Sequence, residues 1–339
     1  MKIAFRVDAS DTIGSGHLMR CLTLATILQR KDVSSTFIVQ KCPGNQIDLI
    51  RKKGFQAHEI QQITKQAIAT NNDKPHVKKY NWEFDSDQTA KILYGLEPSW
   101  LVVDHYALDS RWEENQKKYV RKIMVIDDLA NRKHDSDILL DQNLYPNTDN
   151  RYEQMVSKKC KKLLGIQYAL LQPEYNELRS QVKISDNKIK NIFMYFGNTE
   201  ANNIIIRIMN IFIGLNREDI KLNIVLPDNS GQKEIIAERL KLHPNISLFG
   251  QQKSLASLIL KADLAIGGGG ATTWERLCLG LPSVVITVAD NQRECANYVS
   301  KLGLINLIGD ITTINDETIK KELEILLNKS NLTNWSKRC

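Results

Sequence analysis

The chain has 339 residues, of which 42% are hydrophobic and 25% charged, shares that are ordinary for a globular protein. Its length is more than one comfortable hydrophobic core needs and predicts two domains. The formal net charge of +7 suits a nucleic-acid partner, an acidic small substrate or simply a soluble surface. The densest lysine run, residues 158–162, has no Arg-rich or aromatic continuation, so we interpret it as a solvated face and expect no nucleic-acid partner.

The cysteines and the apolar runs indicate in which cellular compartment to expect the protein. Six cysteines lie far apart, without a C-x-x-C pair or a histidine at zinc-finger spacing. Cys21 and Cys278 fall inside apolar helical patterns, where we expect small buried thiols. The N-terminus reaches Asp8 too early for the core of a signal peptide, and no apolar stretch approaches the length of a membrane span. We therefore expect a cytoplasmic protein without a membrane span.

The first half of the chain alternates apolar runs of strand length with longer amphipathic stretches. Strands are predicted at residues 2–7, 33–39, 55–60, 100–104, 122–128 and 137–141, and helices at residues 17–29 and 46–53. The polar segment 61–87 is the least regular part of this half, and we expect a helix and a mobile loop there.

A second series of the same kind begins near Lys190. It predicts strands at residues 191–196, 221–226, 246–249, 262–266 and 283–288, and helices at residues 203–214, 232–242, 255–261, 272–279, 295–302 and 316–328. Such alternation predicts an α/β fold with parallel sheets covered by helices on both faces. We therefore expect two doubly wound, Rossmann-like domains facing a central cleft, with ligands at the carboxyl ends of the strands.

The two series also suggest domain boundaries. We place an N-terminal domain at residues 1–170, a linker at residues 171–188 and a C-terminal domain at residues 189–339. The last helix is a candidate for packing back on the N-terminal domain. No short-period repeat is present, so the pattern does not suggest a solenoid.

The first candidate site is the string Gly-Ser-Gly-His at residues 14–17, between the first strand and the first helix. Glycines let backbone N–H groups approach a ligand, and a helix N-terminus favours negative charge. A neutral imidazole at His17 suits proton abstraction from water, and the positive helix end favours that neutral form. A capping or packing histidine is the alternative. The string lacks the third glycine of a dinucleotide fingerprint, so we expect no NAD and no other cofactor.

The second candidate site is the string Gly-Gly-Gly-Gly-Ala-Thr-Thr-Trp-Glu-Arg at residues 267–276. Each glycine costs conformational entropy on folding, so four in a row favour a cradle of backbone N–H groups for phosphate. A flexible turn is the alternative. Thr272 and Thr273 can add hydroxyl donors, and Glu275 is placed to accept hydrogen bonds from ribose hydroxyls. No Gly-Lys-Ser/Thr follows, which excludes an ATPase P-loop.

Acidic side chains at predicted strand ends form a third group: Asp8, Asp104 (followed by His105 and Tyr106), Asp127 and Asp128. A carboxylate there can activate water, orient a histidine or bind sugar hydroxyls, and the last two can equally cap the following helix. Their spacing does not establish a metal site, so we predict none. Asn291 and Gln292, just past the last predicted core strand, offer amide groups for sugar hydroxyls or simply begin a helix.

Several strings along the chain resemble the PseG/SpsG family of UDP-sugar hydrolases. The most specific is Gly-Ser-Gly-His-x-x-Arg-Cys at residues 14–21, preceded by Phe-Arg-Val-Asp-Ala-Ser at residues 5–10. The other matching strings lie at residues 103–106, 126–130, 141–143, 165–171, 267–276 and 280–282. The resemblance covers nearly the whole chain. Its length and ending are most similar to the SpsG branch, which is associated with spore coat polysaccharide synthesis.

The resemblance implies the GT-B architecture, shared with MurG-type glycosyltransferases. It also implies hydrolysis of a UDP-2,4-diacetamido-2,4,6-trideoxy sugar to UDP and free sugar, on the route to pseudaminic-acid-like nonulosonates. His17 is implied as the catalytic base, and Glu275 is similar in position to the MurG-type acid that binds ribose. The residues expected to contact the substrate are Gly14, Ser15, Gly16, Arg20, Asp8, Asp104, Tyr106, Gly268, Gly269, Gly270, Ala271, Thr272, Thr273, Glu275, Asn291 and Gln292.

Our leading hypothesis is an inverting, metal-independent hydrolysis in which His17 takes a proton from water and residues 268–272 hold the leaving diphosphate. One string departs from the family: residues 196–200 read Phe-Gly-Asn-Thr-Glu where the family usually has Phe-Gly-Gly-Ser/Thr-Asp. Asn tolerates positive φ, so the turn can persist, but Asn198 adds bulk. Two alternatives stay open: a GT-B glycosyltransferase with a UDP-amino sugar donor, and a catalytically lapsed UDP-sugar-binding protein. The sugar's stereochemistry and the oligomeric state stay open too.

Overall fold

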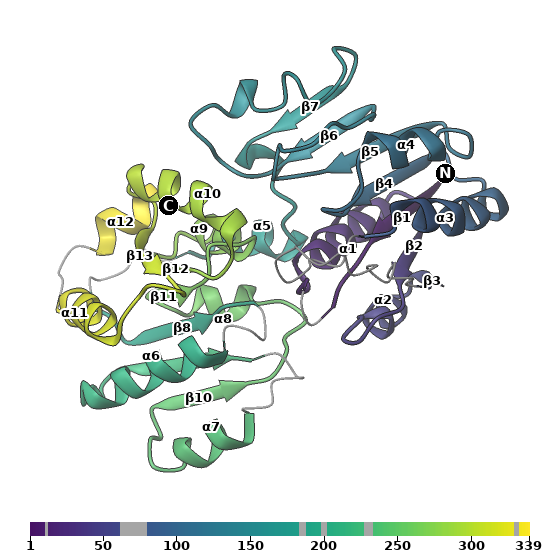
Figure 1. Cartoon of the computed structure of the whole chain (residues 1–339). Coiled ribbons are helices and arrows are strands. Elements are labelled where there is room, and N and C mark those ends of the chain that lie inside the picture. The colour runs from purple at the N-terminus through teal and green to yellow at the C-terminus, as the bar shows by residue number, and fades with distance from the viewer. Residues whose placement is uncertain (11–12, 62–79, 183–187, 198–201, 227–232, 329–331) are drawn as a thin grey trace, which may run out of the picture. The chain divides into compact units, whose positions relative to one another are not determined.

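The computed structural model describes residues 1–10, 13–61, 80–182, 188–197, 202–226, 233–328 and 332–339. They form two compact units, each built on one parallel sheet (Figure 1). The N-terminal unit comprises Met1–Asn143 and Asn147–Leu170, and the C-terminal unit comprises Leu144–Pro146 and Leu171–Cys339. Asn198 and most of the irregular polar segment, residues 62–79, lie outside the described residues.

The N-terminal sheet has seven strands in the order β3-β2-β1-β4-β5-β6-β7. Its strands are β1 (Lys2–Val7), β2 (Ser34–Gln40), β3 (Gln56–Ile60), β4 (Trp100–Asp104), β5 (Lys122–Ile126), β6 (Ile138–Asp141) and β7 (Lys161–Leu164). Its helices are α1 (Gly16–Gln29), α2 (Ile47–Lys52), α3 (Trp82–Leu96) and α4 (Ser110–Gln116), with 3-10 turns η1 (Thr148–Asn150) and η2 (Ile166–Tyr168). The strand order reverses between β1 and β4, where doubly wound sheets bind ligands at their carboxyl ends.

Strand β1 shows how alternating side chains build two cores. Ile3, Phe5 and Val7 pack with residues of α1 and α2, whereas Ala4 packs with residues of α3 and α4. Because helices cover both faces, β1 carries buried apolar side chains on both faces. Parallel pairing then places Val7 beside Asp104, so Asp8, which follows β1, and Asp104, the last residue of β4, lie at the same edge of the sheet.

The C-terminal sheet has six strands in the order β10-β9-β8-β11-β12-β13. Its strands are β8 (Asn191–Tyr195), β9 (Lys221–Val225), β10 (Ile246–Phe249), β11 (Leu264–Gly267), β12 (Ser283–Thr287) and β13 (Asn306–Asp310). Its helices are α5 (Pro173–Arg179), α6 (Asn202–Gly214), α7 (Lys233–Leu240), α8 (Ala256–Leu260), α9 (Thr272–Cys278), α10 (Asp290–Lys301), α11 (Asp316–Leu327) and α12 (Leu332–Arg338). The prediction of an α/β fold with two doubly wound, Rossmann-like halves is confirmed.

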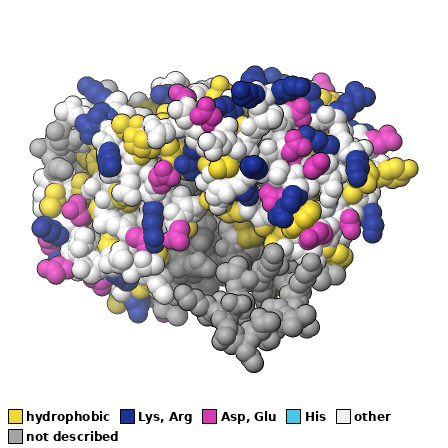
Figure 2. All heavy atoms as spheres, turned by 45° about the horizontal axis from the view of Figure 1, so that its top comes forward, with side chains coloured by type: hydrophobic (Ala, Val, Ile, Leu, Met, Phe, Trp, Pro, Cys, Tyr) yellow, Lys and Arg dark blue, Asp and Glu magenta, His cyan; other side chains and the backbone are white. Residues whose placement is uncertain are grey.

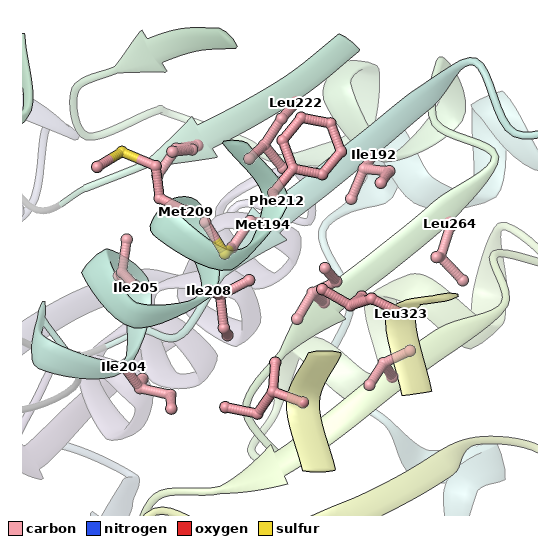
Figure 3. Close-up of a cluster of buried hydrophobic side chains, with 14 of the residues drawn as sticks. Ile192, Met194, Ile204, Ile205, Ile208, Met209, Phe212, Leu222, Leu264 and Leu323 are labelled. Atoms are coloured by element: carbon pink, nitrogen blue, oxygen red, sulfur yellow. The ribbon is translucent and has the colours of Figure 1, made fainter. Parts of the chain in front are cut away.

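Helix α6 closes the larger core of the C-terminal unit. Ile204, Ile208 and Phe212 recur every four residues and are buried with sheet residues such as Ile192 and Leu222 (Figure 3). Helix α12 belongs to the same unit: the Trp335 indole donates to the Leu304 carbonyl, and the Ser336 hydroxyl donates to the Gly280 carbonyl. The last helix, a candidate for packing on the N-terminal domain, thus has these contacts within the C-terminal unit.

The helix expected within residues 61–87 begins there as α3 but extends beyond the segment to Leu96. The elements missed altogether by the sequence pattern are short or polar: α4, α5, β7, β13 and α12. Helix α5 lies in the segment interpreted as a linker. Strand β13 extends the sheet past β12, so residues 283–288 are not the last core strand. Helix α10 begins at Asp290, whereas the sequence pattern predicted its start at residue 295. The prediction was late because the first turn of the helix is polar and its buried residues begin at Cys295. Asn291 and Gln292 therefore lie in a helix.

The lysines of the basic run 158–162 are exposed, as predicted for a solvated face, although two of them also begin β7. Figure 2 shows one face of the molecule, where Lys and Arg side chains are interspersed with Asp and Glu. All six cysteines are free. Cys21 is buried as predicted, whereas Cys278, the last residue of α9, is half-buried. Among the described residues, no helix has the length and apolar character needed to cross a membrane.

Candidate functional site

The first glycine loop connects β1 to α1. The Gly14 N–H donates to the Ser10 carbonyl at 2.8 Å, and Gly14 has a φ of 77°, a left-handed conformation that favours glycine. Ser15 is the N-cap of α1, and Gly16 begins the helix. A Cβ at position 16 would meet no atom within 4 Å. The turn therefore requires glycine at position 14, while position 16 leaves open space at the helix start.

His17, Arg20 and Cys21 lie on one face of α1, since they are three and four positions apart, and all contact Asp104 at the end of β4. The His17 Nδ1 is 2.6 Å from Asp104 Oδ1. The Arg20 Nε and Nη2 donate to the two carboxylate oxygens, each at 2.6 Å. Burial would raise the pKa of Asp104, but Arg20 and then His17 hold it well below its usual range. Asp104 is thus an ionised, fully engaged carboxylate.

This arrangement fixes the tautomer of His17. An ionised carboxylate only accepts hydrogen bonds, so Nδ1 donates and the neutral ring carries its lone pair on Nε2. No residue in the described part of the chain forms a hydrogen bond with Nε2. Ser15 occupies the N-cap position of α1 without a side-chain capping hydrogen bond, and His17 lies inside the helix, so His17 is not the N-cap residue. A histidine oriented by a carboxylate, with its other nitrogen free, is the geometry of a general base.

Tyr106 covers the imidazole from the side. The rings of His17 and Tyr106 meet edge to face, with centroids 4.4 Å apart. Burial raises the pKa of Tyr106, and the charge of its hydrogen-bond partner Asp128 adds to the shift. The Asp128 carboxylate also lies 3.4 Å from Arg20 Nη1. Tyr106 and Arg20, which we expected to contact substrate, therefore make their polar contacts with the groups around His17.

Asp8 belongs to a second buried network. Its carboxylate accepts hydrogen bonds from Arg6, from the Gln40 backbone N–H at 2.7 Å and from His105 Nε2 at 3.0 Å. Arg6 is itself fully buried and also donates to Asp85 of α3 at 2.6 Å. Asp8 is only 2% exposed. Its predicted contact with substrate has no support in this arrangement, because protein donors occupy both carboxylate oxygens.

The three residues that follow the apolar part of β4 each bind a different element. Asp104 binds α1, His105 binds Asp8 after β1, and Tyr106 binds Asp128 after β5. The His105 Nδ1 accepts the Ala107 N–H at 3.1 Å, so its Nε2 carries the hydrogen that Asp8 accepts. This short segment therefore holds His17 and its neighbours in one rigid group.

Asp127 and Asp141 form a third buried group around Tyr152. The Tyr152 hydroxyl lies 3.0 Å from a carboxylate oxygen of each. Asp127 also pairs with Arg132 at 2.7 Å and accepts the Ala130 N–H at 2.9 Å. It therefore caps a turn, which corrects its interpretation as a helix cap. Burial raises the pKa of Asp141 to about 7, although the Asn143 backbone N–H opposes the shift.

The second glycine loop connects β11 to α9 in the C-terminal unit. Packing requires glycine only at its first position, because a Cβ on Gly267 would overlap the Tyr195 carbonyl and the Arg276 guanidinium. At Gly268, Gly269 and Gly270 the nearest atom to a Cβ would be 3.4 Å away. A Cβ at the last three glycines would make ordinary van der Waals contacts, so packing within the unit does not explain why these positions are glycine.

The conformation of this loop is held from two sides. Arg276 is buried beneath it and donates to the Gly268 carbonyl at 2.7 Å. The Gln292 Oε1 accepts the N–H groups of Gly269 at 3.0 Å and Val288 at 3.1 Å. We expected the Gln292 amide to bind sugar hydroxyls, but its oxygen clamps the loop. Asn291, one position earlier, is exposed.

Backbone donors remain at the end of the loop. Gly269 N–H is taken by Gln292, but the N–H groups of residues 270–272 have no hydrogen-bond acceptor in the described part of the chain. Thr273, predicted as a hydroxyl donor, is buried and accepts a hydrogen bond from Arg276 at 3.0 Å. The predicted phosphate cradle is thus narrower than the full glycine string.

Glu275 lies one turn into α9. Its Oε2 is buried and has no hydrogen-bond partner in the described part of the chain, and its carboxylate forms a hydrogen bond with the Tyr175 hydroxyl of α5. Burial raises the pKa of Glu275 to about 7, although Tyr175 and then Arg276 oppose the shift. Burial also lowers the pKa of Arg276 to about 10. A carboxylate oxygen without a partner beside a glycine loop suits a hydroxyl-bearing ligand such as ribose.

The sequence pattern missed Arg6, Asp85, Tyr175 and Arg276 as parts of these sites. Arg6 has a signal in retrospect, since it is a lone charge inside an apolar strand and needs a buried partner. Tyr175 has none, because α5 reaches the loop only through the fold. Among the residues that the structure describes, no group of three or more His, Cys, Asp or Glu side chains could hold a metal ion.

Residues 191–338 match the family model "Glycosyltransferase family 28 C-terminal domain". An uncharacterized protein of Methanocaldococcus jannaschii is 23% identical over 91% of this chain, which spans 60% of that protein. A UDP-2,4-diacetamido-2,4,6-trideoxy-beta-L-altropyranose hydrolase of Campylobacter jejuni is 27% identical over 89% of this chain and 97% of its own length. The spore coat polysaccharide biosynthesis protein SpsG of Bacillus subtilis is 23% identical over 46% of both chains.

The crystal structure of MurG from Acinetobacter baumannii superposes with a TM-score of 0.64, covering 99% of this chain and 94% of its own. At 14% identity this similarity establishes the fold alone. The chain therefore has the GT-B fold, matches the glycosyltransferase family 28 C-terminal domain at residues 191–338, and resembles the PseG/SpsG family of UDP-sugar hydrolases over most of its length.

Proposed function

We propose that this protein hydrolyses a UDP-2,4-diacetamido-2,4,6-trideoxy sugar to UDP and the free sugar, in nonulosonate synthesis for a spore coat or surface polysaccharide. The observation that carries the proposal is the pairing of His17 Nδ1 with Asp104 at 2.6 Å, which leaves Nε2 free to accept a proton. The similarity to the Campylobacter jejuni hydrolase over 89% of the chain supports the choice of substrate. In this proposal, residues 1–170 form the catalytic domain and residues 189–339 the UDP-binding domain.

The chemistry assigned to the N-terminal unit is general-base catalysis without a metal. Water attacks the anomeric carbon as the bond from that carbon to the diphosphate oxygen breaks, and the configuration at the anomeric carbon is inverted. His17 Nε2 takes the proton of the attacking water. The resulting imidazolium is stabilised by Asp104, which is already ionised and hydrogen-bonded to Nδ1. The electron pair of the broken bond leaves with UDP.

The chemistry assigned to the C-terminal unit is binding of the leaving group. The free N–H groups of residues 270–272 donate to the diphosphate, whose charge grows as it departs. Glu275 accepts hydrogen bonds from the ribose hydroxyls through the oxygen that has no protein partner. The hydrogen bonds with Gln292 and Arg276 fix the loop before the ligand binds, so less conformational entropy is lost on binding.

The test measures UDP release from UDP-diacetamido-trideoxy sugars, with and without an added acceptor. We expect release without an acceptor in the wild type and a loss of roughly 10³-fold or more in His17→Ala. UDP binding and the circular dichroism spectrum serve as controls for folding. A folded His17→Ala variant that hydrolyses the sugar at the wild-type rate would sink the proposal.

A GT-B glycosyltransferase with a UDP-amino sugar donor is the second candidate. The match of residues 191–338 to a glycosyltransferase domain favours it, and His17 would then deprotonate an acceptor hydroxyl instead of water. Release of UDP only in the presence of an acceptor would establish this candidate. Tight UDP binding without turnover of any donor would instead indicate a UDP-sugar-binding protein.

A further inference from the structure

The guanidinium of Arg20 lies at the centre of the group around His17. It donates to both oxygens of Asp104 at 2.6 Å, and its Nη1 lies 3.4 Å from Asp128. Its Nη2 also lies 3.1 Å from His17 Nδ1. Arg20 is only 7% exposed, so its charge acts on these neighbours with little screening by water.

The charges around His17 oppose one another. A carboxylate hydrogen-bonded to an imidazole favours the protonated ring, and a protonated ring cannot take a proton from water. A guanidinium beside the same ring nitrogen has the opposite effect, because it repels the imidazolium. Two further neighbours in the described part of the chain are Cys21 on α1 and Tyr106 after β4, and burial raises the pKa of both, so both are neutral. Asp128, after β5, partly neutralises Arg20.

We infer that Arg20 is a positioning residue that keeps His17 neutral and able to accept a proton, and is not a ligand for the substrate. The inference rests on the proposed role of His17 as the base. It also gives a physical reason for the spacing His-x-x-Arg: three positions along a helix place both side chains on the same carboxylate. Arg20 thereby lets Asp104 orient the imidazole without holding it in the protonated form.

The sign of the effect can be tested with two substitutions that act in opposite directions. In Arg20→Met the cation is removed while Asp104 stays, so we expect the His17 imidazole to titrate at higher pH than in the wild type. In Asp128→Asn a negative charge beside Arg20 is removed, so the positive charge of Arg20 acts more strongly and the His17 imidazole should titrate at lower pH. Arg20→Lys keeps a positive charge near Asp104 and should restore most of the wild-type behaviour.

The measurement is an NMR pH titration of the histidine Cε1–H signals in the ligand-free protein. The chain has six histidines, and the His17 signal is the one lost in His17→Asn. Arg51→Met is the matched control, since Arg51 is a half-exposed arginine on α2 of the same unit. Unchanged His17 titration in both Arg20→Met and Asp128→Asn, or a shift of the same sign in both, overturns the inference.

A kinetic readout separates this inference from the proposed function. The acidic limb of the pH profile of kcat/KM reports the free protein, so it should move with the NMR titration in each variant. If the titrations shift as expected but no UDP-sugar is hydrolysed, the proposed function fails and the role of Arg20 stands. If hydrolysis depends on His17 but neither the limb nor the titration moves, Arg20 does not control the base.

Discussion

His17 and Asp104 are joined by a hydrogen bond of 2.6 Å between Nδ1 and Oδ1, although 87 positions separate them in the chain. Parallel pairing of β1 with β4 places Asp104 beside Val7, and the loop after β1 brings the first turn of α1 to the same edge. The orientation of the imidazole is therefore a property of the strand order. It does not depend on local sequence around the histidine alone.

Replacing Asp104 by Asn should leave the fold largely intact but remove the acceptor that fixes the imidazole tautomer. We expect kcat for UDP-sugar hydrolysis to fall by roughly 10³–10⁴-fold, with little change in UDP affinity, because an amide can hold the wrong tautomer. The measurement is steady-state hydrolysis beside UDP binding by calorimetry. Asp109→Asn is the control, since Asp109 is the N-cap of α4 and Asn caps a helix equally well. Equal losses in the two variants would contradict the assignment.

Glu275 should make binding of the nucleotide dependent on pH. Burial raises the pKa of its carboxyl to about 7, so the carboxylate that accepts ribose hydroxyls is present above pH 7 and is lost as the pH falls below it. We expect the affinity for a UDP-sugar to fall between pH 8 and pH 6. In Glu275→Gln the affinity should be weaker by roughly tenfold at pH 8 and nearly independent of pH.

The ligand in this experiment should be a UDP-sugar, because its diphosphate does not titrate in that range as the terminal phosphate of UDP does. Glu294→Gln is the matched control, since Glu294 is exposed on α10 of the same unit. A Glu275→Gln variant that keeps the full pH dependence of binding would show that another group titrates.

Gln292 should act on UDP through the loop that it clamps. In Gln292→Ala the N–H groups of Gly269 and Val288 lose their acceptor, and we expect UDP to bind roughly tenfold more weakly. Asn297→Ala removes an amide from an exposed position of the same helix and should leave binding unchanged. Calorimetry of UDP binding checks both. Wild-type affinity in a folded Gln292→Ala variant would mean that the loop needs no clamp.

The fold could be predicted from the sequence because parallel strands covered on both faces form short apolar runs, such as the Ile-Ala-Phe of residues 3–5. The sequence pattern did not predict strand β7, because the strand begins with exposed lysines. It placed the start of α10 too late, because the first turn of that helix is polar. The candidate base, His17, was found from its glycine loop. Other residues of the sites were harder to predict. Arg6 and Tyr175 reach their sites only through contacts between elements far apart in the chain.

Asp141 should make stability depend on pH. Burial raises the pKa of its folded-state carboxyl to about 7, above the value for an unfolded chain, so its contribution is fully present below about pH 4 and is lost as the pH rises to 7. Asp141→Asn removes this titration. Relative to the wild type, the variant should gain roughly 1–3 kcal/mol of unfolding free energy between pH 4.5 and pH 8.

Urea unfolding at both pH values measures this difference, and the comparison with the wild type cancels the other titrating groups. Asp149→Asn is the control, since Asp149 is exposed in the turn η1 near Tyr152 in sequence. If Asp141→Asn and the wild type show parallel pH profiles, Asp141 is ionised in the folded protein at neutral pH, which would contradict the prediction.

Gly267 and Gly214 differ in whether the space around them would admit a side chain. A Cβ on Gly267 would overlap the Tyr195 carbonyl, which the pairing of β11 with β8 holds in place. We therefore expect Gly267→Ala to lower the unfolding free energy by roughly 1–3 kcal/mol. Gly214 ends α6 in open space, so Gly214→Ala should raise it by up to about 1 kcal/mol. Thermal unfolding of both variants checks the pair, and a neutral Gly267→Ala would mean that β8 and β11 can separate locally without cost.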